Sequence, residues 1–315
     1  MNFFIGVDGG GSKTKCILTD ENFKILAAAK GGASNPLIVG PEKSARLIHS
    51  LISEVIKKSG VKIVGAAVIG LAGAGRKKNA ADVKRALNRI ETGGEFSVKK
   101  IIITSDVTIF AEGALSGKSG ALIIAGTGSI VVGIDKKGNF YRAGGYGKLI
   151  GDEGSGYSIG KKGLNAVAKY FDGRLPNSIL IKMMMKKFAV PDRDSLILKV
   201  YSEKIKAASV APLIIDAAQK GDKTARKILD EELNELILKI DPVIKKIREK
   251  KINLCLSGGL LATENYYSKR FKKRIGQKYK NINIAGSVHP PEMGAAIMAA
   301  KKIKRKSDKK INRIK

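Results

Sequence analysis

Short apolar runs alternate with amphipathic stretches along the first part of the chain, and this alternation predicts its secondary structure. Runs with the length and composition of β-strands cover residues 3–9, 13–19, 23–30, 64–70 and 100–104. Apolar residues at helical spacing cover residues 41–59 and 76–91, and a third helix is expected to begin near Asp106. Three meandering strands followed by alternating helices and strands predict a mixed sheet with helices on its faces.

The middle of the chain repeats the opening pattern. Residues 121–133 again form a strand, a Gly/Ser/Thr turn and a strand, and a hairpin at 136–139 leads into a third strand at 140–143. The repeat is one of pattern, with little residue identity. It predicts two related halves, each presenting a turn suited to phosphate to a shared cleft.

The last half of the chain is mostly helical. Amphipathic stretches cover residues 158–170, 177–188, 194–204, 208–219 and 222–249. A buried strand with a glycine turn that opens a helix follows at 252–261, and a final helix is expected at about 291–303. The remainder, to Lys315, is interpreted as a frayed basic tail.

Composition narrows the class of protein. A length of 315 residues suits two domains, and the net charge of +31 includes +8 from residues 301–315. The chain has no Trp and no nucleic-acid-binding motif, so we expect a small-molecule partner rather than nucleic acid. No apolar run is long enough to span a membrane, and the first residues lack a signal-peptide pattern, so we expect a cytoplasmic protein.

Glycine-bearing turns follow predicted strands at four places, namely residues 9–11, 126–128, 144–147 and 258–259. Consecutive glycines let backbone N–H groups converge on an anion without interference from side chains. Asp8, at the end of the first strand, is placed to hold a hydrated Mg²⁺ beside that anion. The opening segment therefore predicts a site for the phosphate groups of a nucleotide.

The order of these segments resembles that of the BadF/BadG/BcrA/BcrD ATPase family, which includes N-acetylglucosamine kinase and belongs to the actin/hexokinase/Hsp70 superfamily. The resemblance covers residues 3 to about 300. Its motifs are Asp-Gly-Gly-Gly-Ser-Lys-Thr (8–14), Thr-Ser-Asp (104–106), Gly-Thr-Gly-Ser (126–129), Gly-Gly-Tyr-Gly (144–147), Gly-Asp-Glu-Gly-Ser (151–155) and Ser-Gly-Gly (257–259).

The resemblance implies an α/β fold of two ribonuclease-H-like (actin-like ATPase) domains. Each domain would be a mixed five-stranded sheet flanked by helices, with a cleft between the two that closes on ATP and an acceptor. The N-terminal domain would comprise residues 1–113 plus 292–306. The C-terminal domain would comprise residues 114–291, with a basic tail at 307–315. Relatives often form dimers, so a homodimer is also an expectation.

The resemblance also implies site residues. Asp106 is similar to the catalytic base of sugar kinases, and Asp8 to the acid that organises Mg²⁺. The expected ATP-binding residues are Gly9, Gly10, Gly11, Ser12, Lys13, Thr14, Thr127, Gly128, Ser129, Gly258 and Gly259. The expected sugar-binding residues are Asn35, Asp106, Thr127, Gly145, Tyr146 and Asp152.

Several of these residues also have a plain structural interpretation. Asp106 fits a helix N-cap, and Asp152 fits the first turn of a helix. Asn35 precedes a proline, as turn residues do, Ser12 also suits a turn, and Lys13 suits a solvated surface. The motifs around them favour the functional interpretation for Asp106 and Asp152.

Three functions compete. A sugar kinase needs positioning, charge neutralisation and a proton acceptor, which the motifs provide. An ATPase activator of a 2-hydroxyacyl-CoA dehydratase or benzoyl-CoA reductase system would need two closely placed cluster cysteines, but Cys16 and Cys255 lie far apart in sequence. A binding module with a regulatory ATP site would not need Asp106.

The sequence leaves open which sugar accepts the phosphate. The mammalian type of N-acetylglucosamine kinase has Trp after its third strand and in its later Gly-Gly-Trp-Gly segment, where this chain has Leu37 and Tyr146. N-acetylglucosamine, glucosamine or another hexose is the expected acceptor. An acidic sugar such as 2-keto-3-deoxygluconate is the alternative.

Overall fold

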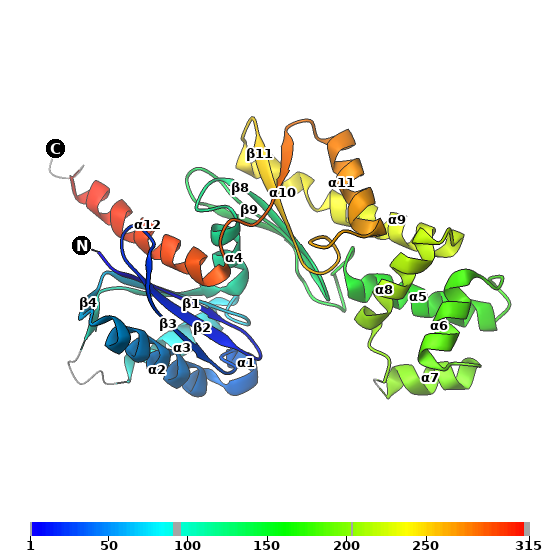
Figure 1. Cartoon of the computed structure of the whole chain (residues 1–315), viewed down its shortest axis with the longest axis horizontal. Coiled ribbons are helices and arrows are strands. Elements are labelled where there is room, and N and C mark those ends of the chain that lie inside the picture. Colours follow the sequence, from blue (N-terminus) through cyan, green and yellow to red (C-terminus); the bar gives the residue numbers. More distant parts are fainter. Residues whose placement is uncertain (1, 91–95, 203, 312–315) are drawn as a thin grey trace. The chain divides into compact units, whose positions relative to one another are not determined.

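The computed structural model describes residues 2–90, 96–202 and 204–311, and in it the chain forms two compact units (Figure 1). Unit 1 comprises Met1–Lys118 with Ser287–Lys315, and unit 2 comprises Ser119–Gly286. The boundaries expected from sequence, at 113/114 and 291/292, each assign five more residues to unit 2. Backbone contacts explain the difference, because the N–H groups of Val288 and His289 donate to the carbonyls of Ala114 and Gly113 (3.2 and 3.1 Å).

The described part of unit 1 contains a five-stranded mixed sheet in the order β3-β2-β1-β5-β7. Strands β1, β2 and β3 form an antiparallel meander, and β5 and β7 continue from β1 in parallel. The strands are β1 (Phe4–Gly9), β2 (Thr14–Thr19), β3 (Ile25–Gly31), β5 (Ala66–Leu71) and β7 (Ile101–Ser105).

Helices cover both faces of this sheet (Figure 1). Helices α2 (Pro41–Ser59) and α3 (Lys77–Asn88) pack on the face that carries Ile5 and Val7. Helices α4 (Asp106–Ala114) and α12 (Pro291–Ile311) pack on the face that carries Phe4. Because side chains alternate along a strand, Gly6 and Asp8 belong to the α12 face.

Unit 2 repeats this topology. Its described residues contain a five-stranded sheet in the order β10-β9-β8-β11-β12, again an antiparallel meander continued by two parallel strands. The strands are β8 (Gly120–Ala125), β9 (Ser129–Ile134), β10 (Phe140–Gly144), β11 (Ile252–Ser257) and β12 (Ile282–Ala285). The two related halves predicted from the repeat and the α/β fold class implied by the resemblance are confirmed.

Most helices of unit 2 lie between β10 and β11 in sequence and share one apolar core with the sheet. They are α5 (Gly156–Phe171), α6 (Ile179–Phe188), α7 (Arg193–Tyr201), α8 (Ala207–Gln219), α9 (Lys223–Leu238) and α10 (Asp241–Ile247), and α11 (Tyr266–Lys278) follows β11.

Some sequence-based expectations are corrected. The helix expected over 222–249 is two helices, because Pro242 lacks an N–H group and begins α10 as a first-turn residue. The final helix continues to Ile311 instead of ending near 303, and residues 312–315 of the expected tail lie outside the described residues. The helix expected after the glycine turn at 258–259 is present as α11. Elements that the sequence pattern did not predict are α1 (Pro36–Val39), β12 and a small parallel pair, β4 (Ile63–Val64) and β6 (Ser97–Val98).

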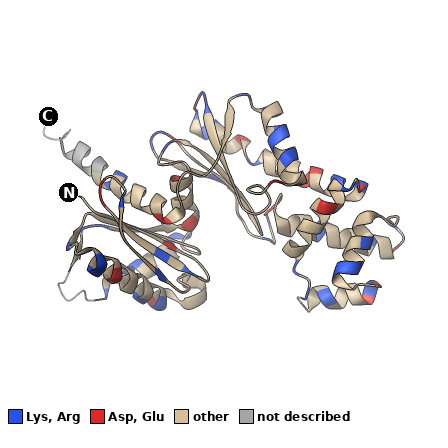
Figure 2. Cartoon of the chain, in the orientation of Figure 1, with Lys and Arg blue, Asp and Glu red and all other residues tan. Residues whose placement is uncertain are grey.

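Lys and Arg are distributed over helices and loops of both units (Figure 2). This distribution agrees with solvated charge on helix faces. Among the described helices, none is long and apolar enough to cross a membrane.

Candidate functional site

The first predicted phosphate turn, residues 9–14, connects β1 to β2 in unit 1. The N–H of Gly10 donates to the carbonyl of Lys13 (2.9 Å) and closes the turn. Gly11, Ser12 and Lys13 are exposed at its tip. A tight turn with an exposed glycine-containing tip leaves room for an anion to approach the backbone.

Buried contacts hold this turn in shape. The Thr14 hydroxyl donates to the carbonyl of Gly32 and lies 2.7 Å from the Ser34 hydroxyl. A Cβ atom on Gly9 would stand 2.2 Å from that Ser34 oxygen, so only glycine fits there. The buried Thr14 side chain thus acts on the shape of the turn, and its predicted contact with ATP stays a prediction.

Asn35 lies directly beside the turn. Its backbone N–H donates to the carbonyl of Gly10 (3.1 Å), and its side-chain oxygen accepts from the N–H of Leu37 (2.9 Å) as the N-cap of α1. This capping bond uses the side-chain oxygen of Asn35. The NH₂ group of the same side chain supplies two donors, which suit a sugar hydroxyl.

Two carboxylates lie at the same sheet edge. Asp8 stands near the end of β1, and Asp106 begins the helix that follows β7. Burial, Glu292 and Asp106 raise the pKa of Asp8 from 3.8 to about 6, against the opposing effect of two lysines. Burial also raises the pKa of Asp106. Raised carboxylate pKa values at a phosphate turn are typical of functional sites.

Asp106 is not the N-cap of its helix. Ser105 fills that position, and its hydroxyl accepts from the N–H of Thr108 (3.2 Å). Asp106 is the first helical residue, and its Oδ1 accepts from the adjacent N–H of Val107 (2.9 Å). The plain capping interpretation therefore applies to Ser105, and the carboxylate of Asp106 stays available for chemistry.

The second predicted phosphate turn, residues 126–129, connects β8 to β9 in unit 2. The N–H of Gly126 donates to the carbonyl of Gly128 (2.9 Å). The start of α5 lies against the turn, because Gly156 and Tyr157 donate to the carbonyls of Gly126 and Thr127 (2.7 and 3.1 Å). The turn and the N-terminus of α5 therefore form one local structure.

Asp152 is held against this turn. It is 8% exposed, has a left-handed backbone (φ 67°) and accepts from the N–H of Ser129 (3.3 Å). A Cβ atom on Gly128 would stand 3.0 Å from its carboxylate oxygen, so glycine allows the close approach. A non-glycine residue at positive φ is a costly conformation that often marks a functional position.

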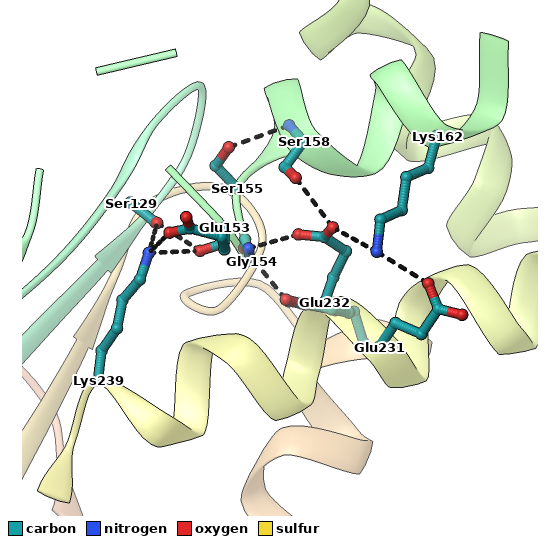
Figure 3. A network of polar contacts seen from close by, with 10 residues as sticks. Ser129, Glu153, Gly154, Ser155, Ser158, Lys162, Glu231, Glu232 and Lys239 are labelled. Carbon is teal, nitrogen blue, oxygen red and sulfur yellow. Dashed lines mark hydrogen bonds and ion pairs between the residues drawn. The ribbon is translucent and has the colours of Figure 1, made fainter. Parts of the chain in front are cut away.

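Lys239, the C-cap residue of α9, joins this local structure (Figure 3). Its ammonium group donates to the hydroxyl of Ser129 (3.0 Å) and to the carbonyl of Glu153 (2.8 Å). The same group pairs with the Glu153 carboxylate (2.8 Å) and holds the pKa of Glu153 below its usual range. Ser129 in turn donates to the Glu153 carbonyl (2.6 Å).

Glu232 fixes the other side of the same loop (Figure 3). Its nearly fully buried carboxylate accepts from the N–H of Gly154 (2.5 Å) and the hydroxyl of Ser158 (2.9 Å), and pairs with Lys162 (3.0 Å). Neither Glu232 nor Lys239 could be predicted from the sequence, because a lysine or glutamate inside a charged helix carries no distinguishing signal. Only the fold brings them to the turn.

We expect Lys239→Met to raise KM for ATP about tenfold, because hydrogen bonds to a charged group contribute about 1.5–3 kcal/mol and these organise the second turn. Lys278→Met, at the end of α11, removes an ion pair with Asp241 of α10 and provides the matched control, with an expected change below about twofold. Steady-state kinetics on both variants measure the effect. Equal KM values for ATP in the two variants would contradict the assigned role of Lys239.

The glycine turn after β11 lies beside the second phosphate turn. Gly258 has φ 84°, and a Cβ atom there would stand 2.2 Å from the carbonyl of Ala125. The N–H of Leu260 donates to that same carbonyl (3.1 Å). A Cβ atom on Gly259 would meet nothing within 4 Å, so an open surface adjoins the turn. This placement suits the predicted contact of Gly258 and Gly259 with adenosine.

Gly145 and Tyr146 follow β10. Gly145 has φ 72° and donates to the carbonyl of Ser129 (3.1 Å), which ties this segment to the second turn. Tyr146 is 67% exposed, with Arg142 over its ring. Their predicted role in sugar binding stays a prediction.

The two cysteines give no structural support to the activator alternative. Cys16 lies in β2 of unit 1 and Cys255 in β11 of unit 2, and both are buried. Burial raises the pKa of both thiols, which disfavours the thiolate form that binds iron.

Comparison with known proteins agrees with this fold. Residues 5–299 match the profile of the BadF/BadG/BcrA/BcrD ATPase family, and the chain belongs to that family. It is 33% identical over 306 residues to the N-acetylmuramic acid/N-acetylglucosamine kinase of Clostridium acetobutylicum, covering 95% of this chain and 98% of that protein.

A second curated relative and a solved structure match similar shares of the chain. The N-acetyl-D-glucosamine kinase of Dictyostelium discoideum is 33% identical over 312 residues, covering 94% of this chain and 97% of that protein. A solved structure from Chromobacterium violaceum, assigned as an N-acetylglucosamine kinase, superimposes with a TM-score of 0.67 at 22% identity, covering 95% of this chain and 99% of that one. This last likeness concerns the fold.

Proposed function

We propose that this protein is an ATP-dependent sugar kinase that transfers the γ-phosphate of ATP to a hydroxyl group of an amino sugar. The identity of 33% with two amino-sugar kinases along nearly the whole chain supports this function. The observation that carries it is the Asp106 carboxylate, which is half-buried, does not cap its helix and lies near Asp8 beside an exposed glycine turn.

In this proposal, backbone N–H groups of residues 9–14 and 126–129 bind the phosphates of ATP. Asp106 accepts the proton of the attacking hydroxyl, and its raised pKa makes it a stronger base than an ordinary aspartate. Asp8 fits a Mg²⁺ ion, since a carboxylate beside a phosphate turn provides the oxygen ligand that this ion prefers. The ion would neutralise phosphate charge.

N-acetylglucosamine is the first acceptor to test, because both kinases with 33% identity are named for it. N-acetylmuramic acid, named with the Clostridium acetobutylicum kinase, carries a carboxylate and suits a chain of net charge +31. 2-Keto-3-deoxygluconate is the acidic alternative outside the amino sugars.

The test is an ATP-consumption assay with Mg²⁺ over N-acetylglucosamine, N-acetylmuramic acid, glucosamine, glucose and 2-keto-3-deoxygluconate, with the products identified by mass spectrometry. We expect kcat/KM to be highest for an N-acetylated amino sugar. A preference for 2-keto-3-deoxygluconate would overturn the acceptor class. ATP hydrolysis that no sugar stimulates would overturn the kinase assignment.

A further inference from the structure

We infer that Glu292, in the first turn of α12, is a second acidic residue that binds the divalent cation together with Asp8. This inference rests on the proposed function, because it concerns the cation that accompanies the nucleotide. It assigns a role to a residue that the sequence motifs did not include.

Helix α12 brings Glu292 against the strand that carries Asp8. A Cβ atom on Gly6 would stand 2.0 Å from the carbonyl oxygen of Glu292, so the helix touches β1 directly. Gly6 and Asp8 share one face of that strand. A Cβ atom on Gly294 would likewise stand 2.0 Å from the carbonyl of Ile109, so α4 also fixes the start of α12.

The carboxylate of Glu292 is buried and half paired. The residue is 8% exposed, and its Oε1 forms an ion pair with Lys15 (3.1 Å). Its Oε2 is buried and has no hydrogen-bond partner among the residues that the structure describes. Buried carboxylate oxygens are normally satisfied, so this oxygen calls for a ligand.

The surrounding charges favour a cation. Lys15 lies opposite Asp8 in the β1–β2 pairing, and the negative charges of Glu292 and Asp106 act on Asp8 together with the positive charges of Lys15 and Lys13. Within the described residues, no group of three or more His, Cys, Asp or Glu side chains is arranged to hold a metal. A site with the two carboxylates of Asp8 and Glu292 is enough for Mg²⁺, which takes one or two carboxylates and completes its shell with water and substrate phosphate.

The competing explanation is purely structural. Acidic residues stabilise the first turn of a helix, and Glu292 could serve only to pair with Lys15. The two explanations predict different effects of removing Lys15 on cation affinity. If Glu292 binds the cation, removing Lys15 removes a competing positive charge and leaves cation affinity equal or higher. If Glu292 only pairs with Lys15, removing either partner has the same effect.

The experiment measures Mn²⁺ binding to the full chain in the presence of ADP by electron paramagnetic resonance. We expect Glu292→Gln to weaken Mn²⁺ binding about 10- to 100-fold and Lys15→Met to leave it equal or tighter. Glu112→Gln is the matched control, because Glu112 is also a buried acid between α4 and α12, paired with Lys301 (2.5 Å). It should bind Mn²⁺ as the wild type does.

Binding by Glu292→Gln within about twofold of wild type, or equal weakening by Lys15→Met, would overturn the role of Glu292. If Glu292→Gln does not fold, Glu292→Asp takes its place. It keeps the charge on a shorter side chain and should still weaken binding, so wild-type affinity in that variant would overturn the inference. Failure of the wild type to bind Mn²⁺ with ADP would instead overturn the proposed function.

Discussion

Asp106→Asn is expected to lower kcat for sugar phosphorylation by about 10²- to 10⁴-fold, the usual contribution of a positioned general base. The amide keeps the shape of the side chain and its acceptor for the N–H of Val107, so the start of α4 should be preserved. The Kd for ATP, measured by calorimetry, should stay close to that of the wild type. Wild-type turnover in this variant would remove Asp106 from the base role.

The pH profile gives a second readout. A base must be deprotonated, so wild-type kcat should fall as pH decreases through the raised pKa of Asp106. The residual activity of Asp106→Asn should lack this limb. Asp192→Asn, at the N-cap of α7 in unit 2, is the matched control and should keep both kcat and the profile.

Asp8→Asn is expected to weaken cation binding, so that the divalent-cation concentration needed for half-maximal turnover rises at least about tenfold. It is also expected to stabilise the protein without metal at neutral pH. The folded chain raises the pKa of Asp8 from 3.8 to about 6, so between these values the folded state holds a proton that the unfolded state has released. Stability therefore falls as pH rises from about 4 to 6, and this loss persists above pH 6.

Asparagine at position 8 removes this loss of stability, because its side chain does not ionise. A rise from 3.8 to about 6 would correspond to about 3 kcal/mol for a fully buried group, and the partial exposure of Asp8 reduces this to about 1 kcal/mol. Thermal unfolding in EDTA should give a higher Tm for Asp8→Asn than for wild type at pH 7.5 and no gain at pH 3.5. A lower Tm at pH 7.5, or unchanged cation dependence, would contradict this account of Asp8.

Much of the fold could be predicted because local patterns and long-range pairing agree. The runs around Asp8 and Gly126 each end in a glycine turn, and a meander of three strands leaves few alternatives for pairing. The missed elements lack such signals. Strand β12 is short, and β4 and β6 have two residues each, so alternation could not reveal them.

The residues of the candidate site likewise include some that the sequence predicts and some that it does not. Residues on turns were found, because glycine and hydroxyl residues after a strand are visible in one segment. Glu292 lies 277 positions from its partner Lys15, and Lys239 lies 110 positions from Ser129. Tertiary packing alone brings these pairs together, so no local pattern could identify them.

Hydrogen–deuterium exchange of the full chain, with and without a non-hydrolysable ATP analogue and Mg²⁺, tests the central claim most directly. The claim is that the amides of both turns bind the phosphates of ATP. It predicts slower exchange in peptides covering residues 9–14 and 126–129 when the analogue binds. Binding of the analogue with unchanged exchange in both segments would contradict it.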